Sequence, residues 1–530
     1  MAYHAKSSKI SAPGLFGLTL VLALLLMILG GSVSTTLLLG ADAQDGANND
    51  PADLQLAGPT NQGASQAGFV ATNGDLDWPQ VQRDPQRTGY TPEILSTNFQ
   101  AAWSHPFQPE KVYPQVQAIV YDGKVFVGTE MGNLYALGAQ TGEGKWVYNV
   151  GSPILNSVAA GDGKAFFGAM DGAVYALDVT TGSLVWKSQL SWRIGFSTAA
   201  VLAESKVMLG GRNGVFYALD PDTGATLWQY DVGSPILQTA AWNDGRVVFG
   251  AMDMHVYAIN SADGTLAWGS ERIPGMAFKD YWPVLYDGNI FIGPMGVAET
   301  DVMGVGFPFR EVWSSDDPIW GWYAENGPTI TEGRLTDVPE AMDAQDAAMA
   351  NYQANPANYT KNLYILDEAT GEEAFVVPHW TVQTQHGATT PPCVDRDGKL
   401  IVPLRFLKSG WGRLDLTAQR ITDILYDHTD RLGGPMDSGD VPAGMGNPDE
   451  NLNVACTGNL VLALHTAECC NGYSGAFDLD DRKWTVFGRG PTNGQMATGT
   501  QGGGGNPASV SDGMVYHISR HELIARSAQP

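Results

Sequence analysis

This chain has few positively charged residues. It carries 30 Lys and Arg against 56 Asp and Glu, which gives a formal net charge of −26. An acidic surface repels phosphate backbones, and no basic stripe with interleaved aromatic residues is present, so nucleic-acid binding is not expected. The acidity otherwise indicates a well-solvated surface, with an acidic docking face as the alternative.

Three common catalytic signatures are also missing from the sequence. The nine histidines show no zinc-motif spacing, so each is interpreted as a hydrogen-bonded structural residue. The Gly-rich run at 501–507 lacks the Lys-Ser/Thr of a phosphate-binding loop, and no Gly-x-Ser-x-Gly nucleophile elbow occurs. These absences disfavour zinc hydrolases, P-loop enzymes and serine hydrolases of that type.

The N-terminal 43 residues have the pattern of an export signal. Lys6 and Lys9 precede an uncharged run of 25 residues at 15–39, and Ala41-Asp42-Ala43 follows as a small-x-small site. The run is longer than a usual signal core of about 7–15 residues and reaches the roughly 20 residues that span a bilayer. We predict a signal peptide or signal anchor at 1–43, and favour a retained anchor.

Two further predictions follow from this N-terminus. Residues 44–76 are rich in Ala, Gly, Asn, Gln and Asp, which predicts a flexible linker. The remaining chain is then extracytoplasmic, either periplasmic or at the cell surface, and either membrane-anchored or secreted.

Residues 112–272 repeat one pattern four times. In each copy an apolar segment and a Gly precede Tyr-Ala-Leu or Tyr-Ala-Ile, and a polar turn ending in Gly precedes a Trp. The tyrosines step by 40, 42 and 40 residues, and each Trp follows its Tyr by 11. The markers are Tyr135, Tyr175, Tyr217 and Tyr257 with Trp146, Trp186, Trp228 and Trp268. Such self-similarity is typical of a repeat protein.

The composition of one copy predicts strands. Residues 165–167, 174–177 and 184–186 are short runs of apolar, β-branched and aromatic residues separated by Gly, Asp and Thr. They are too short for helices, and Asp171-Gly172 between two of them suits a tight hairpin. Three or four such strands per roughly 40 residues make one blade of a β-propeller.

The pattern Ala-x-Asp-x-x-Thr-Gly-x-x-x-Trp at 176–186 and 218–228 resembles the repeat of the pyrroloquinoline-quinone (PQQ)-like propeller family. That family includes quinoprotein alcohol dehydrogenases and a non-catalytic lipoprotein that assists outer-membrane protein assembly. The resemblance implies that the repeat tryptophans pack between neighbouring blades, and by itself it implies nothing about a bound quinone. These tryptophans are Trp146, Trp186, Trp228, Trp268 and Trp484.

Beyond residue 272 the repeat becomes irregular. A fifth blade begins near Tyr281, but the next repeat tyrosine, Tyr364, lies 107 residues after Tyr257. About 67 residues are therefore inserted, at about 297–360, since one repeat spans about 40 residues. Good helix formers between residues 339 and 356 predict a helix inside the insertion.

Two degenerate blades follow, and the last stretch, 512–527, supplies only inner strands. The unassigned strand around Trp103 would complete that final blade and remove the open sheet edges of the ring. We therefore predict an all-β, eight-bladed β-propeller over 77–530, with an N-terminal strand closing the last blade and one helical insertion.

Ligands of propellers bind where loops converge at one end of the central channel, and here the irregular loops lie between about 274 and 505. Cys469 and Cys470 are adjacent, and the resemblance implies a vicinal disulfide against a quinone. The alternative is a redox-inert turn or two separately paired thiols, with Cys393 and Cys456 as the other cysteines. Trp320, Trp322 and Trp411 are the further candidate ligand-binding residues, since a flat indole can stack on a ring system.

A quinone enzyme of this kind would also need calcium. Asn447, Asp449, Glu450 and Asn451 supply the hard oxygen ligands that calcium prefers. Clusters of Asp, Asn and Pro are also ordinary turn residues, and that interpretation stays open.

Two functional hypotheses from different classes follow. The favoured one is a membrane-tethered binding or scaffold module for an unknown protein or polymer, with no cofactor. The second is a PQQ- and calcium-dependent quinoprotein dehydrogenase oxidising an alcohol or a sugar, supported by Cys469-Cys470 and the Trp-rich insertion. Binding of a sugar or polymer through exposed tryptophans shares the architecture of the first hypothesis.

Overall fold

The computed structural model describes most of the chain from residue 76 onwards. The described ranges are 76–192, 194–275, 277–294, 339–354, 356, 363–377, 390–403, 411–425, 453–464, 473–489, 506–519 and 521–529. Among these residues, no helix has the length and apolar character needed to cross a membrane.

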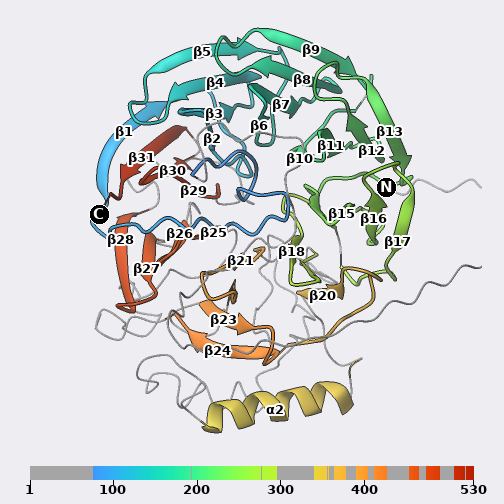
Figure 1. The fold of residues 1–530 in the computed structure, drawn as a ribbon, viewed down its shortest axis with the longest axis vertical. Coiled ribbons are helices and arrows are strands. Elements are labelled where there is room, and N and C mark those ends of the chain that lie inside the picture. Colours follow the sequence, from blue (N-terminus) through green and yellow to red (C-terminus); the bar gives the residue numbers. More distant parts are fainter. Residues whose placement is uncertain are drawn as a thin grey trace, which may run out of the picture. The chain divides into compact units, whose positions relative to one another are not determined.

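Eight antiparallel sheets stand around a common axis as the blades of a β-propeller, as predicted (Figure 1). In blades 1 to 7 the strands pair in sequence order and the first strand lies innermost, while in blade 8 the innermost strand is β29 (Figure 1). Blades 1 and 2 contain β2 (Ile119–Tyr121), β3 (Lys124–Gly128), β4 (Asn133–Gly138), β5 (Gly144–Asn149), and β6 (Ala159–Gly161), β7 (Lys164–Gly168), β8 (Ala173–Asp178), β9 (Leu184–Gln189). Blades 3 and 4 contain β10 (Val201–Ala203), β11 (Lys206–Gly210), β12 (Val215–Leu219), β13 (Thr226–Asp231), and β14 (Ala241–Asn243), β15 (Arg246–Gly250), β16 (Val256–Asn260), β17 (Leu266–Gly269).

The second half of the ring follows the same plan with one short blade. Blade 5 has three strands, β18 (Val284–Tyr286), β19 (Asn289–Ile292) and β20 (Tyr364–Asp367). Blades 6 and 7 contain β21 (Cys393–Val394), β22 (Leu400–Pro403), β23 (Trp411–Asp415), β24 (Arg420–Ile424), and β25 (Asn453–Cys456), β26 (Leu460–Leu464), β27 (Tyr473–Asp478), β28 (Lys483–Arg489). Blade 8 contains β29 (Ser509–Ser511), β30 (Met514–Ser519), β31 (Glu522–Ser527) and, outermost, β1 (Gln100–Pro106).

The ring closes through β1, which confirms the predicted closure. β1 pairs antiparallel with β31, with Trp103 opposite Ala525. The Trp103 ring lies 6.0 Å from the ring of Tyr516 in β30. The earliest described strand and the last strands of the chain therefore form one sheet, and β1 covers the edge of β31 that would otherwise be unpaired.

A Trp–Gly contact locks one blade to the next. Trp146 of β5 lies against Gly182 in the turn of blade 2, where an added Cβ would come within 2.5 Å of the indole. The indole N–H donates to the Val179 carbonyl at 3.1 Å. The same pair of contacts recurs for Trp186, Trp228, Trp268 and Trp103 with the glycine of the following blade. Trp484 is also buried, and its ring lies against Gly475 of its own blade.

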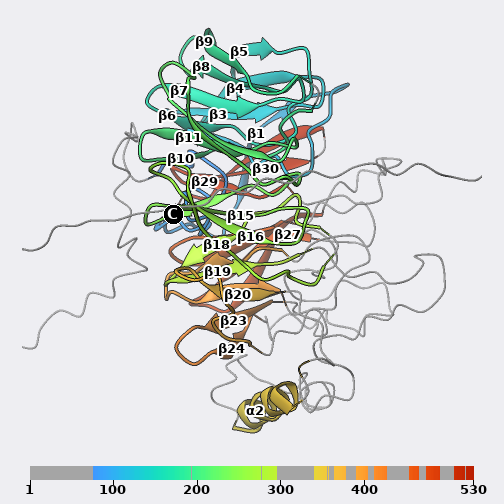
Figure 2. The same ribbon diagram turned by 90° about the vertical axis from the view of Figure 1, so that its right-hand side faces the viewer.

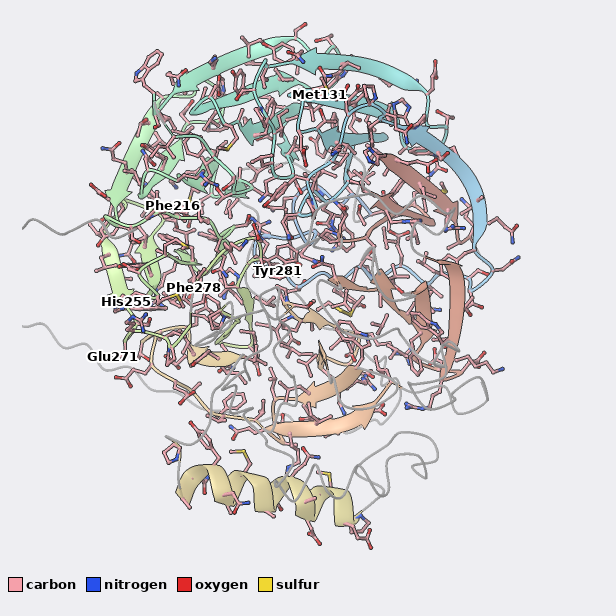
Figure 3. All side chains as sticks on the ribbon, turned by 180° about the vertical axis from the view of Figure 1, so that it is seen from behind. Met131, Phe216, His255, Glu271, Phe278 and Tyr281 are labelled. Carbon is pink, nitrogen blue, oxygen red and sulfur yellow. A yellow bond between two sulfur atoms is a disulfide. The ribbon has the colours of Figure 1, made fainter. Side chains whose placement is uncertain are left out.

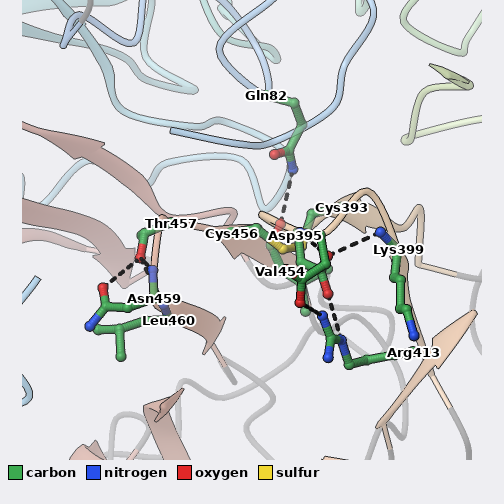
Figure 4. The surroundings of a disulfide bond; sticks show 11 residues. Gln82, Cys393, Asp395, Lys399, Arg413, Val454, Cys456, Thr457, Asn459 and Leu460 are labelled. Atoms are coloured by element: carbon green, nitrogen blue, oxygen red, sulfur yellow. Dashed lines mark hydrogen bonds and ion pairs between the residues drawn. A yellow bond between two sulfur atoms is a disulfide. The ribbon is translucent and has the colours of Figure 1, made fainter. Parts of the chain in front are cut away.

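The seam between blades 6 and 7 is built from charges instead, near the disulfide and the Asp395–Arg413 ion pair that Figure 4 shows. Asp423 of β24 occupies the place of the tryptophan, since it pairs with Arg413 as Trp146 pairs with Ala136. Arg482 stands where the turn glycine stands in other blades, with φ 54°. Its two terminal nitrogens each lie 3.0 Å from a different Asp423 oxygen. A salt bridge between buried side chains thus replaces the Trp–Gly contact.

Covalent and ionic contacts reinforce this seam. A disulfide joins Cys393 of β21 to Cys456 of β25, the innermost strands of blades 6 and 7. The Arg413 Nε lies 2.6 Å from Asp395 Oδ2 beside it. Burial raises the pKa of Asp395, while the charge of Arg413 opposes that rise.

Helix α2 (Pro339–Ala354) confirms the predicted helical insertion and lies beside β24 (Figures 1 and 2). Its buried Gln345 donates from Nε2 to the Ile421 carbonyl at 2.9 Å and accepts from the Ile421 N–H at 3.1 Å. Met342, Met349 and Tyr352 pack on the apolar cluster of blades 5 and 6. The helix therefore covers the outer edge of β24 in blade 6, next to blade 5, which has three strands among the described residues.

Candidate functional site

The innermost strands all start at the same end of the ring, which we call the loop end. Because the strands of each blade alternate in direction, the loop end holds the connections between blades and the hairpin between the second and third strands. The opposite end, the turn end, holds the hairpins between first and second strands, such as Asp162-Gly163, and the turns between third and fourth strands that close on glycine. The short turns at the turn end leave the loop end as the place for larger structures.

The irregular connections of blades 5 to 8 all leave from the loop end. They separate strand ends that lie there, for example β19 from β20, β24 from β25 and β26 from β27. The sequence-predicted candidates Trp320, Trp322, Asn447, Asp449, Glu450, Asn451, Cys469 and Cys470 belong to these connections and lie outside the described residues.

Residues 77–93, which we call the axial segment, cross the centre of the ring (Figure 1). The segment contacts the blades in their own order, from Trp78 at β2, through Pro85 at β14, to Gly89 at β25. Most of its side chains are buried, including Trp78 and Arg87, which are fully buried. The axial segment fills the channel at the level of the inner strands.

Buried polar side chains just before the inner strands form a second layer, the polar belt. The Gln117 N–H donates to Ser157 Oγ at 2.7 Å, which joins blade 1 to blade 2. Asn156 Nδ2 lies 3.3 Å from Thr239 Oγ1 of blade 4, and the Thr239 N–H donates to the Tyr281 carbonyl of blade 5 at 2.9 Å. The polar belt consists of Gln117, Asn156, Ser157, Thr198, Gln238, Thr239, Tyr281, Thr390 and Asn506, all buried.

The belt surrounds the channel rather than the rim. Figure 3 shows Tyr281 near the centre of the ring, with Met131, His255 and Glu271 toward its periphery. Asn506 of blade 8 donates to the carbonyls of Tyr113 and Val116 in blade 1, at 2.9 and 2.7 Å. Hydrogen bonds between blades hold these side chains in one orientation, as a binding site requires.

Tyr113 reaches across the channel. Its hydroxyl lies 3.5 Å from Asp280 Oδ1, although Tyr113 precedes blade 1 and Asp280 precedes the opposite blade 5. Burial and the negative charge of Asp280 raise the pKa of Tyr113 to about 12, and the nearby Arg212 opposes this shift. Tyr113 is therefore a neutral hydrogen-bonding group at physiological pH.

Two buried polar atoms beside the belt have no hydrogen-bond partner among the described residues, the Nε1 of Trp282 and the Oε1 of Gln115. An unpaired buried polar atom costs about 1–3 kcal/mol, so a donor and an acceptor are available here for a ligand or for water. The described part of the chain contains no group of three or more His, Cys, Asp or Glu arranged to hold a metal ion.

The remaining sequence candidates fall in the core. Trp411 is completely buried in β23, in an apolar cluster with Cys393, Cys456 and Trp484. Because Cys393 and Cys456 are joined to each other, neither is available to Cys469 or Cys470.

Sequence reasoning missed the polar belt and the axial segment. The belt residues are single polar positions that precede each inner strand, and they are chemically different from blade to blade. A signal was present, because a Gln, Asn, Ser or Thr precedes six of the eight apolar inner strands, at Gln117, Ser157, Thr198, Thr239, Thr390 and Asn506. Such polar residues bordering short buried strands predict hydrogen bonding around a channel.

Comparison with known proteins supports this architecture. The family described as outer membrane protein assembly factor BamB matches residues 97–192 and 171–294. No curated protein matches the chain. Quinohemoprotein alcohol dehydrogenase from Comamonas testosteroni is 13% identical with a TM-score of 0.53, over 87% of this chain and 82% of that one. Quinohemoprotein alcohol dehydrogenase ADHIIG from Pseudomonas putida HK5 is 14% identical with a TM-score of 0.52, over 85% and 80%. BamB from Moraxella catarrhalis is 15% identical with a TM-score of 0.47, over 81% and 99%.

At these identities the structural likeness establishes the fold alone. The fold is that of an eight-bladed β-propeller, with residues 77–93 across its axis. Within that class, residues 97–294 match the family described as outer membrane protein assembly factor BamB, and this match covers less than half of the chain.

Proposed function

We propose that this chain is an exported, membrane-tethered propeller that acts as a binding or scaffold module for a protein or polymer partner, through its loop end. The observation that carries the proposal is the asymmetry of the two ends. The axial segment fills the channel, the described turns at the turn end are short, and the strand ends that flank the long connections of blades 5 to 8 lie at the loop end.

The loop end also carries the most exposed large apolar side chain described. Trp192, in the connection from blade 2 to blade 3, is 84% exposed, and Met131 in the β3–β4 hairpin is 58% exposed. Backbone hydrogen bonds hold these loops, from Ser191 N to the Gly172 carbonyl and from Gly132 N to the Thr129 carbonyl, both at 3.0 Å. A held, exposed Trp is the type of residue that anchors protein interfaces.

Site-specific photo-cross-linking in intact cells tests this proposal. A photoreactive residue at Trp192 is compared with one at Thr180, which is exposed in the turn of the same blade at the turn end. We expect a discrete cross-linked partner from position 192 and none from position 180. Equal cross-linking from both positions, or from 180 alone, contradicts loop-end binding.

One observation favours the quinoprotein dehydrogenase as a second candidate. The disulfide between Cys393 and Cys456 leaves Cys469 and Cys470 with only each other as partners within the chain. Among the described residues, the Trp282 Nε1 donor would hold an oxygen of PQQ, since it has no other partner there. When bound, the quinone would accept the electrons of an alcohol or sugar.

A binding assay separates the two candidates. PQQ with calcium is added to the purified protein, and ligand absorbance, melting temperature and alcohol- or sugar-dependent dye reduction are measured. The binding-module proposal predicts no change in any of them. A rise in melting temperature at micromolar quinone that is reduced in Trp282→Phe favours the dehydrogenase, because a ligand that binds only the native state stabilises it.

A further inference from the structure

The inner strands present one hydrogen-bond donor at the same position in seven consecutive blades. In each, the N–H of the second residue of the inner strand, or its equivalent in β25, points at the axial segment. Every donor is paired, at 2.7–3.1 Å. The donors belong to Val120, Ala160, Leu202, Trp242, Leu285, Val394 and Cys456, and their acceptors to Trp78, Pro79, Gln80, Pro85, Gln86, Thr88 and Gly89.

This row of donors favours an extended peptide segment that presents acceptor oxygens at matching positions. An inner strand is a sheet edge, and its unpaired N–H groups need acceptors when they are buried. Six of the seven acceptors are backbone carbonyls, and the seventh is the Gln80 side chain. Two of the carbonyls belong to Pro79 and Pro85, which bring an acceptor without an N–H that would itself need a partner.

Side chains set the register of the segment. The Arg87 guanidinium donates to the carbonyls of Ala240, Ala200 and Val81 at 3.0, 3.2 and 2.8 Å, so it joins blades 3 and 4 to the segment. Gln82 donates from its N–H to Gln117 Oε1 at 2.8 Å. A shift by one residue would bury the Arg87 charge without these acceptors, at a cost of several kcal/mol.

The contacts of the segment continue to Ser96, whose N–H donates to the Ala528 carbonyl of blade 8 at 2.7 Å. Trp78 and Val120 exchange backbone hydrogen bonds at one end, and Thr91 donates to the Cys456 carbonyl at the other. Leu95 is buried and exchanges hydrogen bonds with the Asn459 side chain, whereas Pro92, Ile94 and Asn98 are exposed. The segment is therefore held by the blades and not only by its link to the propeller.

We infer that the channel is a peptide-binding track, for an extended chain that presents carbonyls at this spacing and one Arg, and that residues 77–91 are its resident ligand. A break after the exposed Asn98 then leaves the N-terminal part of the chain attached to the propeller. This inference goes beyond partner binding at the loop end and does not depend on it.

A controlled break in the full chain tests the inference. A short protease recognition sequence is inserted after Asn98, the folded protein is cut, and the products are run on a size-exclusion column without denaturant. We expect the N-terminal fragment to co-elute with the propeller. Separation of the fragment, whether the remainder stays folded or aggregates, overturns the inference.

Peptide exchange tests the register. A labelled synthetic peptide of residues 77–98 is incubated with the cut protein, beside an Arg87→Met peptide and a control peptide with the exposed Ile94 changed to Ala. We expect the first and third to replace the resident fragment, and the Arg87→Met peptide to bind at least about tenfold more weakly, since one lost charged hydrogen-bonding group is worth 1.4 kcal/mol or more. Equal binding of all three overturns the assigned track.

Discussion

Changing Arg482 to Met removes the charge that replaces the Trp–Gly contact between blades 6 and 7. The Arg482 and Asp423 side chains are only 10% and 7% exposed, and they form two parallel contacts of 3.0 Å. Met keeps an unbranched stem beside Phe477, over whose ring the guanidinium lies at 5.7 Å. The substitution therefore leaves Asp423 buried and poorly paired with little change in packing.

The expected loss of stability follows from this geometry. Breaking a buried ion pair from one side costs about 3–5 kcal/mol, because the remaining charge is left in the interior. Arg413 Nη1 stays 3.6 Å from Asp423 Oδ2, which compensates part of that charge. We therefore expect about 3 kcal/mol for Arg482→Met, at the lower end of the range.

A double-mutant cycle measures the pair itself. The free energy of unfolding in urea is compared for the native chain, Arg482→Met, Asp423→Asn and the double variant, and hydrogen exchange follows the amides of β24 and β28. We expect a coupling energy of about 2–3 kcal/mol, because both charges are desolvated. The double variant should then lose less free energy of unfolding than the sum of the two single variants' losses.

An exposed ion pair is the matched control. Lys145 and Glu143 lie 2.8 Å apart, but their side chains are 39% and 70% exposed. Solvent screens such a pair, so its cycle should show no coupling above experimental error. If the Asp423–Arg482 coupling were equally small, the seam would not be held by charge, and the reasoning would be refuted.

Three further predictions concern the ring. Gly182→Ala should lower the free energy of unfolding by at least about 2 kcal/mol, and Gly163→Ala by about 1 kcal/mol less, because both glycines have φ 71° but only Gly182 faces an indole. Urea unfolding of both variants checks this, and equal losses would contradict the Trp–Gly contact. Replacing Cys393 and Cys456 together by Ala should cost about 4 kcal/mol in the same assay for a loop with a sequence separation of 63, and a loss below about 1 kcal/mol would count against the disulfide as a stabilising link. Burial lowers the pKa of His517 to about 3, so the unfolded chain binds more protons than the folded chain between pH 3 and about 6.5. The contribution of His517 to the free energy of unfolding should therefore be fully present above pH 6.5 and decline as the pH falls. His517→Gln should flatten the dependence of stability on pH in that window, and an unchanged dependence would contradict the burial of a neutral His517.

The ring was predictable because its information is local and repeated. One period of about 40 residues carries the Tyr, Asp, Gly and Trp that each blade needs, and four copies make chance agreement improbable. The closure by Trp103 could also be inferred, because the lone strand near the start of the described chain can complete the last blade, which lacks its outer strand. The helix followed from good helix formers between two prolines.

The contacts that define the channel are not local. Gln82 hydrogen-bonds to Val454, 372 residues away, and no period relates the two. Arg413 is visible in the sequence where an alanine stands in other blades, but its partners Asp395 and Asp423 are found only when β21, β23 and β24 form one sheet. Arg482 reaches Asp423 from the neighbouring blade, and the sequence pattern of a single blade cannot indicate such a contact.

The sequence by itself determined the blade, the number of blades and the direction in which the chain closes on itself, because strand period, turn chemistry and a repeated Trp act within about 40 residues. Only the tertiary structure decided that residues 77–93 fill the channel, that polar residues from several blades meet as a belt, and that one seam is ionic. Those features depend on side chains brought together around an axis, where burial makes unpaired donors and charges costly and so selects their partners.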